Sequence, residues 1–312
     1  MNNSMYDEML PVGTVLKGCY EITERVGRHH IEQEYRAIDR DKGLECRIRE
    51  FFLDGYMTRA QGEKDVQLQR GIRIRNHYEN SKKFFGDKAW LMCSVQGKPN
   101  ILSVYDVFCE NNTAYYVSEA VNAVTLETYC RTRGCLDERE IKYITSQLCS
   151  ALKELHKKSI LHLNIVPQHI LICSDKKAYE NVKLIVNDEC KLVDKDFYKE
   201  PKILMCMYPS YCAPETYEYV RETGLRTDIY MLGAVMYKMA TGENPDEATN
   251  RCICDKMKSP LELNPQISKE FSDVIMRAME LKYQKRYRNE DRLMRAMGEN
   301  YEINEMIGRT LL

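Results

Sequence analysis

The beginning of the chain alternates between apolar and polar residues with the two-residue period of β-strands. This alternation covers residues 13–53. Within it, the segments 34–43 and 44–52 suit a hairpin, because Asp41-Lys-Gly43 between them is typical of a tight turn. The pattern therefore predicts an antiparallel sheet near the N-terminus.

The alternation is interrupted and then resumes. Residues 53–82 are strongly polar and poorly periodic, which predicts a long connection. Residues 84–95 favour a helix, and residues 101–121 return to strand-like alternation around a polar loop at Asn111-Asn112. We therefore expect a mainly β region that contains one main helix.

After residue 121 the pattern becomes mostly helical. Asp137-Glu-Arg-Glu140 fits a capping box in which the Asp137 carboxylate accepts from early backbone amides. A core-facing stripe follows it at three- and four-residue spacing: Ile141, Ile144, Leu148, Leu152 and Leu155. Residues 226–240 are apolar nearly all round and predict a buried helix, and further helices fit 267–281 and 289–299. Strands first and helices second predict an α+β protein with two lobes.

Composition removes several classes of function. The 312 residues are 44% hydrophobic and carry a formal charge of −1, which gives no reason to expect nucleic acid or an anionic membrane as a partner. The thirteen cysteines are scattered, with Cys252-Ile-Cys254 the only close pair, so reduced thiols are expected rather than a metal site. Three methionines of the 226–240 helix are expected to fill the core: Met231, Met236 and Met239.

Membrane attachment is not expected either. The N-terminus is polar and acidic, unlike a signal peptide, and no apolar run approaches the roughly 18 residues that span a bilayer. We therefore expect a cytoplasmic protein.

The segment from Leu161 to Leu171 carries the most specific signal. It resembles the catalytic loop of protein kinases, His-Arg-Asp-x-x-x-x-Asn. Asn164 stands where that family keeps the aspartate that accepts the substrate proton, and His169 stands where it keeps a magnesium-binding asparagine. An amide is not a base, and histidine is a poor ligand for magnesium, although His169 could serve as an alternative base. The resemblance gives His162 a structural role below the metal-binding motif.

Other landmarks of the same family occur in order. Tyr211-Cys-Ala-Pro-Glu215 is similar to the Ala-Pro-Glu motif, and Arg286 matches the arginine that pairs with its glutamate. Thr227-Asp228 is similar to the start of the central helix, where the aspartate holds the catalytic-loop backbone through its amides. The resemblance implies structural roles for Glu215, Asp228 and Arg286.

The resemblance covers nearly the whole chain and includes a leader, from Gly13, like that of bacterial eukaryotic-like serine/threonine kinases. It implies a bacterial protein with the two-lobed kinase fold. Residues 1–12 would form an N-terminal tail, 13–120 the small antiparallel β-sheet lobe with its main helix, and 121–312 the larger, mainly helical lobe. The 53–82 connection would then belong to the small lobe.

The nucleotide positions depart from the family pattern. The glycine-rich loop keeps only Gly27, while Glu34 replaces the apolar residue that covers adenine. Arg49 occupies the position of the phosphate-binding lysine, whose helix partner would be Asp87. Arg47 replaces the alanine that leaves room for adenine, and its guanidinium would fill that space, paired with Glu34 across the hairpin.

The metal-binding Asp-Phe-Gly motif has two possible alignments. The preferred one uses Asp194-Lys195-Asp196 and makes Asp194 the only candidate metal ligand. The other uses 182–188 and puts residues 186–188 at the motif, which leaves no aspartate at the metal position. Either alignment supplies at most one carboxylate, against the paired metal clamp of the family.

These departures predict a pseudokinase-like regulatory scaffold that binds other proteins and needs no cofactor. The first alternative is a divergent ATP-dependent serine/threonine kinase that uses magnesium bound to Asp194. The second is a sensor that binds ATP without catalysis. If ATP binds, the resemblance implies that it contacts these residues: Gly27, Arg49, Glu119 and Val121.

Overall fold

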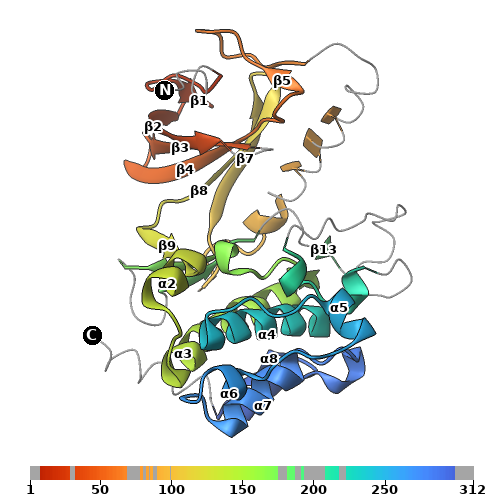
Figure 1. Ribbon diagram of the computed structural model, residues 1–312. Coiled ribbons are helices and arrows are strands. Elements are labelled where there is room, and N and C mark those ends of the chain that lie inside the picture. The colour runs from red at the N-terminus through yellow and green to blue at the C-terminus, as the bar shows by residue number, and fades with distance from the viewer. Residues whose placement is uncertain are drawn as a thin grey trace. The chain divides into compact units, whose positions relative to one another are not determined.

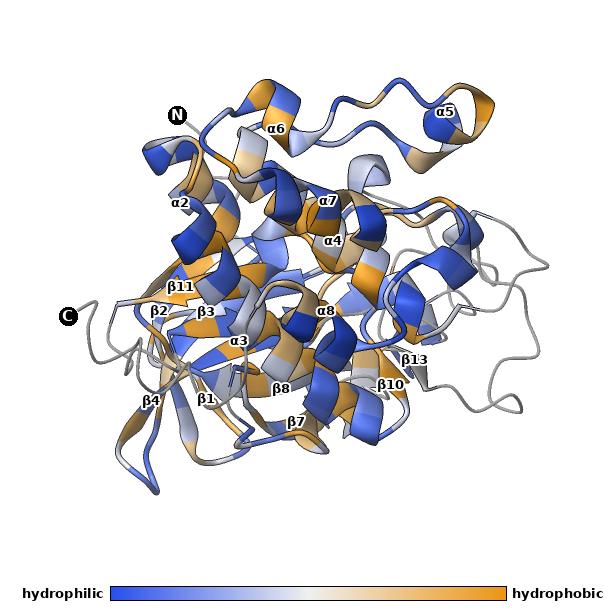
Figure 2. Cartoon of the chain, turned by 90° about the horizontal axis from the view of Figure 1, so that it is seen from below, coloured by the Kyte–Doolittle hydropathy of each residue, from blue (hydrophilic) through white to orange (hydrophobic). Residues whose placement is uncertain are grey.

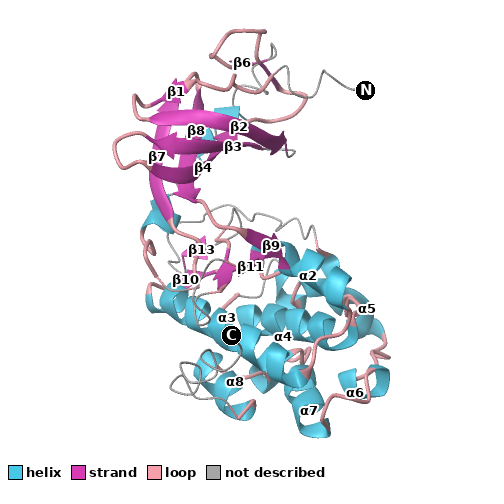
Figure 3. Cartoon of the chain, turned by 90° about the vertical axis from the view of Figure 1, so that its left-hand side faces the viewer, coloured by secondary structure: helices cyan, strands magenta, loops and turns pink. Residues whose placement is uncertain are grey.

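The computed structural model describes residues 8–28, 32–68, 78–79, 82–83, 85–86, 90–98, 100–174, 181–186, 191–192, 208–217 and 223–298. The chain divides into two compact units (Figure 1). The first unit comprises Met1–Gly97 and Leu102–Val121, and the second comprises Lys98–Ile101 and Asn122–Leu312. The predicted α+β class is confirmed, because the first unit is built on a sheet and the second is mainly helical (Figure 3).

Six strands of the first unit form one antiparallel sheet in the order β1-β2-β3-β4-β8-β7. They are β1 (Val15–Leu16), β2 (Tyr20–Arg28), β3 (Glu32–Asp39), β4 (Leu44–Phe51), β7 (Val104–Glu110) and β8 (Thr113–Glu119). The sheet is curled, since Lys17 after β1 reaches the opposite edge, where its Nζ lies 2.7 Å from Asp106 of β7. Tyr20 also donates to Asp106, at 3.0 Å, and stacks on Phe108. Both edges of the sheet are therefore joined.

The two predicted turns are present. Gly43 closes the β3–β4 hairpin with a φ of 66°, and the Asp39 side chain accepts from the amides of Asp41 and Lys42. Asn111 and Asn112 join β7 to β8 with φ values of 51° and 59°. Asparagine adopts this left-handed region more readily than other side chains do, which explains why this pair makes the turn.

The 53–82 segment has more structure than its polarity indicated. Its strands β5 (Met57–Thr58) and β6 (Gln67–Leu68) pair with each other. The Arg59 side chain is buried and bonded to the Glu50 carboxylate of β4. The segment assigned to an N-terminal tail also differs from expectation, because Met9 and Leu10 pack in the core of the sheet. Polar composition suggested an exposed loop, but a buried ion pair and main-chain hydrogen bonds satisfy these polar groups.

Of the helix predicted over 84–95, the structure describes helical residues at 85–86 and 90–93. In this part of the chain Phe85 is buried, and its ring packs on Phe51 and Tyr116. The described part of the segment thus covers the sheet through aromatic contacts.

The second unit contains α2 (Leu126–Arg133), α3 (Glu138–Lys157), α4 (Leu225–Thr241), α5 (Ala248–Ile253), α6 (Pro260–Leu263), α7 (Lys269–Ala278) and α8 (Glu290–Ala296). Its short strands are β9 (Ala123–Thr125), β10 (Ile160–Leu161), β11 (Ile170–Cys173), β12 (Val182–Leu184) and β13 (Lys191–Leu192). Single turns of 3-10 helix are η2 (Pro167–His169), η4 (Pro209–Tyr211), η5 (Pro214–Thr216) and η6 (Tyr283–Lys285). Periodicity predicted α3, α4, α7 and α8, but it did not predict α2, α5, α6 or the single turns of 3-10 helix.

The helix ends follow local chemistry. The Asp137 side chain accepts from the Glu140 amide at 2.8 Å, as expected, but the Glu140 carboxylate accepts from Tyr129 and does not close the box. α7 and α8 begin later than predicted, because the side chains of Ser268 and Asn289 cap their first turns, and they end three residues earlier, at Ala278 and Ala296. Figure 2 shows apolar and polar residues alternating along α3 and α7, in keeping with one buried side on each.

α4 is the central buried helix, as its apolar sequence predicted. Its three methionines are buried in the core: Met231, Met236 and Met239. Gly233 allows α7 to approach closely, because a Cβ on Gly233 would lie 2.8 Å from the Ala278 Cβ. The cysteines that the structure describes are free thiols. Among the described residues, no helix has the length and apolar character needed to cross a bilayer.

Candidate functional site

The first unit carries a cluster of ion-paired side chains on β3 and β4. Glu34 stands directly opposite Arg49 in the strand register. Arg47 lies two residues before Arg49 in β4, on the same face of the sheet. The Glu34 carboxylate lies 3.1 Å from the Arg47 Nη1 and 3.7 Å from the Arg49 Nη2. The ion pair of Glu34 with Arg47 that the sequence suggested is therefore present, and Arg49 joins it.

Arg49 is held within its own sheet. Its Nη1 donates to the Tyr116 hydroxyl at 2.8 Å, and its Nε lies 3.6 Å from the Glu32 carboxylate. Burial alone would lower the pKa of Arg49, but Tyr116, Glu32 and Glu34 hold this pKa above its ordinary value. Asp87, the expected partner of Arg49, lies outside the described residues.

The other residues assigned to nucleotide contact have ordinary structural surroundings. Gly27 lies in β2 opposite Glu34, and its backbone does not need glycine, because a Cβ there would meet nothing within 4 Å. Glu119 is buried, and its carboxylate accepts from the Ser103 amide at 2.8 Å. Val121 is half-buried at the end of the first unit.

In the second unit, His162 organises the loop that joins β10 to β11. Its Nδ1 accepts from the Asn164 amide at 3.2 Å, so the proton is on Nε2, which donates to the Ile185 carbonyl at 2.9 Å. Burial lowers the pKa of His162 to about 4. The ring is therefore neutral at pH 7 and serves as a bridge between two backbone segments.

Asn164 and His169 are joined through the same loop. Asn164 is buried, and its backbone carbonyl accepts from the His169 Nδ1 at 3.1 Å. The His169 ring meets the Tyr208 ring edge to face, with centroids 5.8 Å apart. The two substituted loop positions are thus packed together with Tyr208 within one unit.

Asp228 of α4 holds the backbone of this loop. Its two carboxylate oxygens accept from the amides of His162 and Leu163, at 2.9 and 2.8 Å. This is the contact that the kinase resemblance implied. The Leu163 φ of 60° is a strained conformation for leucine, and the two bonds from Asp228 help to maintain it.

His156, at the end of α3, is a structural residue that the sequence analysis did not identify. Its Nε2 donates to Asp228 at 2.7 Å, and its Nδ1 lies against the Glu290 carboxylate. Burial opposes protonation, but these carboxylates raise the pKa of His156 to about 9. The sequence did carry a signal for this position. His156 lies four residues after Leu152 of the core-facing stripe, and this spacing puts it on the same face of the helix.

From the pKa values of the two buried histidines, His156 and His162, we expect the free energy of unfolding to be greatest near pH 6.5. The folded-state pKa of His156, about 9, is above its ordinary value of 6.5, so its contribution is complete below pH 6.5 and lost as the pH rises towards 9. The folded-state pKa of His162, about 4, is depressed, so its contribution is lost as the pH falls from 6.5 towards 4. Each contribution is roughly 3 kcal/mol, at about 1.4 kcal/mol per pKa unit.

Urea denaturation of the protein and of His156→Gln across this pH range measures the alkaline part of the effect. We expect the variant to lose the decline in stability between pH 6.5 and 9 while it keeps the decline below pH 6.5. Parallel profiles for the two proteins on the alkaline side would contradict the assignment to His156.

Glu215 and Arg286 form the buried ion pair that the Ala-Pro-Glu resemblance implied. The Arg286 Nη1 and Nη2 donate to the two Glu215 oxygens at 2.7 and 2.9 Å. The Thr227 hydroxyl donates to the same carboxylate at 2.8 Å. All three residues are buried, and the pair joins segments 71 residues apart in the sequence.

The strand pairing bears on the position of the metal motif. β12 pairs with β11, the strand that follows the catalytic loop, and leads to Ile185 and the buried Val186. β13, which precedes Asp194, pairs with β10 instead. Asp194 and residues 187–188 lie outside the described residues. Those residues that are described contain no cluster of three or more His, Cys, Asp or Glu side chains suited to a metal ion.

Comparisons with known proteins identify the family. A model of the protein kinase domain matches residues 72–297. The chain is 26% identical over 294 residues to a probable serine/threonine-protein kinase of Clostridium acetobutylicum, covering 91% of this chain and 40% of the relative. It is also 26% identical over 275 residues to a probable serine/threonine-protein kinase of Clostridium perfringens, covering 86% of this chain and 36% of the relative. The chain thus spans about two-fifths of the length of these relatives.

Solved structures agree with this fold. The structure titled PpkA-294 apo form has a TM-score of 0.74 at 24% identity, covering 93% of this chain and 99% of that one. The PknI kinase domain of M. tuberculosis has a TM-score of 0.63 at 15% identity, covering 93% of this chain and 98% of that one. The antiparallel curled sheet and the helical second unit are those of the kinase fold. The chain belongs to the protein kinase superfamily.

Proposed function

We propose that this protein is a pseudokinase, a kinase-fold scaffold that acts by binding other proteins and transfers little or no phosphate. The observation that carries the proposal is the position of the Glu34 carboxylate between the guanidinium groups of Arg47 and Arg49. In the kinase resemblance, these three positions face the adenine ring and the phosphates. Here they are occupied by charges that satisfy one another.

These side chains do not suit ATP. Adenine needs a thin apolar slot, and inserting it beside Arg47 would expel or desolvate an ion pair. The phosphates need glycine amides and a compact ammonium, whereas Glu32 and Glu34 add negative charge and Arg49 is bonded to Tyr116. The residues present therefore do not fit a bound nucleotide, and no catalytic step is assigned to one.

The loop in the second unit supports the same proposal. Asn164 offers an amide where a base is required. His169 uses its Nδ1 proton to bond the Asn164 carbonyl, which gives the residue a structural task. Phosphoryl transfer depends on positioning and electrostatic stabilisation, so these substitutions should compound.

The position of His162 supports the metal-motif alignment that lacks an aspartate. The resemblance puts this histidine directly below the metal-binding motif, and its Nε2 donates to the carbonyl of Ile185. The motif would then begin at Val186, a buried apolar residue that cannot bind magnesium. We therefore favour 186–188 over Asp194 as the motif, which makes a magnesium site still harder to build.

Nucleotide binding is the decisive measurement. We expect no change in melting temperature on addition of ATP and magnesium, whereas a bound ligand well above its dissociation constant would raise it by several degrees. Arg47→Ala combined with Glu34→Ala opens the proposed slot and should bind an adenine nucleotide better than the unaltered protein does. Arg36→Ala with Glu24→Ala, an exposed ion pair between the neighbouring strands β2 and β3, is the matched control.

Transfer of labelled phosphate to generic protein substrates tests the rival kinase activity. The protein should give no more transfer than a reaction without protein does, and Asn164→Asp alone should not create activity. A clear thermal shift together with transfer above that background would establish a divergent kinase, and loss of the transfer in Asp194→Ala would show that it uses magnesium bound to Asp194. A shift without transfer would establish an ATP-binding sensor.

A further inference from the structure

The second unit presents one apolar tip at the end of α5. Ile253 is 86% exposed, the highest value among the large hydrophobic residues of the described chain. Cys252 and Cys254 on either side of it are exposed free thiols. Three consecutive apolar or weakly polar side chains therefore face solvent and form a small contiguous apolar patch, and covering it with another surface would be favourable.

The tip is held in place by a buried guanidinium. Arg251 is 4% exposed, and its Nε and Nη2 donate to the two oxygens of Asp255 at 3.1 and 3.0 Å, which closes the loop around Ile253. Its Nη1 also bonds to the Tyr230 hydroxyl and the Met279 carbonyl. The hydrogen bonds from Arg251 hold the pKa of Asp255 below its ordinary value, so the clamp persists at neutral pH. The tip is preorganised for contact.

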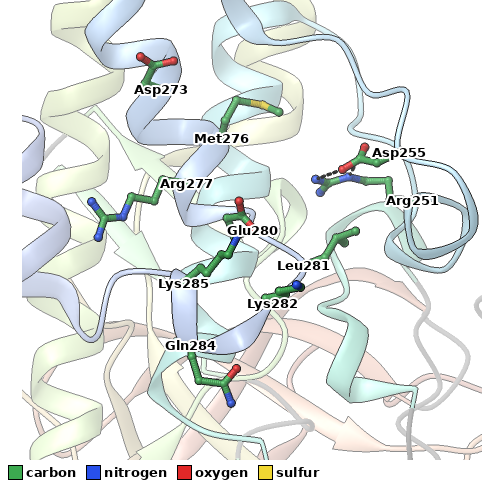
Figure 4. A pocket seen from close by; sticks show the side chains of 10 residues that line it. All are labelled: Arg251, Asp255, Asp273, Met276, Arg277, Glu280, Leu281, Lys282, Gln284 and Lys285. Atoms are coloured by element: carbon green, nitrogen blue, oxygen red, sulfur yellow. Dashed lines mark hydrogen bonds and ion pairs between the residues drawn. The ribbon is translucent and has the colours of Figure 1, made fainter.

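A hollow of about 740 Å³ lies directly beside the tip (Figure 4). Arg251 and Asp255 form one wall of it, and α7 together with the loop that follows forms the rest. Met276 and Leu281, both half-buried, supply its apolar lining. The hollow is large enough for a loop tip of several residues.

The charged residues at the hollow have both signs. Asp273 and Glu280 provide the carboxylates, while Arg277, Lys282 and Lys285 provide the cations. A strongly acidic partner would be repelled by the carboxylates, and a strongly basic partner would be repelled by the cations. A second copy of the same surface offers carboxylates to the cations and cations to the carboxylates, so ion pairs can form across the contact.

We propose that two copies of this chain form a symmetric dimer in which Ile253 of each copy enters the hollow of the other. A two-fold contact requires a patch that is complementary to itself, with a projection and a recess side by side. The tip and the hollow share Arg251 and Asp255, so one rotation can bring both projections into both recesses. The proposal does not depend on the loss of catalysis proposed above.

Self-association of the 312-residue chain, measured by sedimentation equilibrium over a range of concentrations, tests the dimer. Ile253→Asp should weaken dimerisation by about tenfold or more, since it puts an unpaired carboxylate in an apolar contact. Leu44→Asp is the control, because Leu44 is another exposed hydrophobic residue, 57% exposed, in the other unit. A chain that stays monomeric at every concentration, or equal effects of the two substitutions, would overturn the proposal.

Disulfide trapping tests the geometry of the contact. Gln284 is exposed and lines the hollow, so Gln284→Cys puts a thiol where the partner's tip should arrive. Mild oxidation with diamide should link two copies of this variant, and Cys252→Ser with Cys254→Ser should abolish the link. Linked copies that persist without the tip thiols, or no linked copies at all, would contradict insertion of the tip into the hollow.

Discussion

Replacing Arg286 with methionine is expected to lower the free energy of unfolding by roughly 3 to 5 kcal/mol, because it leaves the Glu215 carboxylate buried without its cation. Arg286 is 2% exposed and donates to both oxygens of Glu215. It also donates to the carbonyls of Glu280, Arg226 and Leu281. The substitution would leave these buried oxygen atoms without their donor, and water cannot easily replace it, so stability is lost.

Urea denaturation followed by far-UV circular dichroism measures this change. Arg295→Met is the matched control, since Arg295 is exposed in the last turn of α8 and should change stability by no more than about 0.5 kcal/mol. The double variant Arg286→Met with Glu215→Gln should lose less than the sum of the single losses, because it leaves no buried charge. Additive losses would show that the ion pair is not the source of the effect.

Replacing Glu50 with methionine should be similarly damaging in the first unit. The Glu50 carboxylate is fully buried and accepts from the Tyr115 hydroxyl at 2.6 Å, the Tyr35 hydroxyl at 2.8 Å and the Arg59 guanidinium. Without it, the buried Arg59 cation has no carboxylate partner, and we expect a loss of roughly 3 to 5 kcal/mol. Hydrogen exchange of the β3 and β4 amides reports the loss in this unit.

Glu45→Met on the same strand is the control, because Glu45 is exposed and its change should stay within about 0.5 kcal/mol. The double variant Glu50→Met with Arg59→Met replaces the buried pair with apolar groups and should recover much of the loss. A double variant as unstable as Glu50→Met alone would point to the tyrosine hydroxyls, and not to Arg59, as the groups that need the carboxylate.

The first unit is also more extensive than its sheet. Leu10 donates its amide to the Tyr35 hydroxyl, and the Glu8 carbonyl accepts from Arg59. Arg28 lies 2.9 Å from the Glu8 carboxylate and 2.6 Å from Asp54. The hydrogen bonds around Glu50 therefore connect the sheet to two other segments, the N-terminal residues and the polar 53–68 region. Charged residues that looked like a solvated loop hold the unit together.

The catalytic positions and the framework positions of this kinase fold have separate physical requirements. Glu215, Arg286 and Asp228 are buried charges whose removal would leave unpaired partners, so the fold depends on them. In the proposed alignment with the kinase motifs, Asn164, His169 and Arg49 occupy positions where catalysis, not folding, would dictate the residue, and each makes a hydrogen bond within its own unit. On that proposal, the scaffold is kept while the substituted positions serve structure.

Local patterns were enough to predict much of this protein. The alternation of β3 and β4, the stripe of α3 and the apolar α4 depend on neighbours two to four residues apart, so the sequence alone determined them. The order of the kinase motifs determined the fold class, and the cross-strand spacing indicated the pair of Glu34 and Arg47.

Only the tertiary structure decided which distant groups meet. Arg59 reaches Glu50 from a segment whose polarity suggested a loop, and His156 lies between Asp228 and Glu290, which come from two later helices. Likewise, the bond from His162 to Ile185, on which the proposed alignment of the metal motif rests, joins two segments 23 residues apart. The physical reason is that a buried charge or a neutral histidine is stable only with its partner. That partner is chosen by the packing of remote segments and not by sequence spacing.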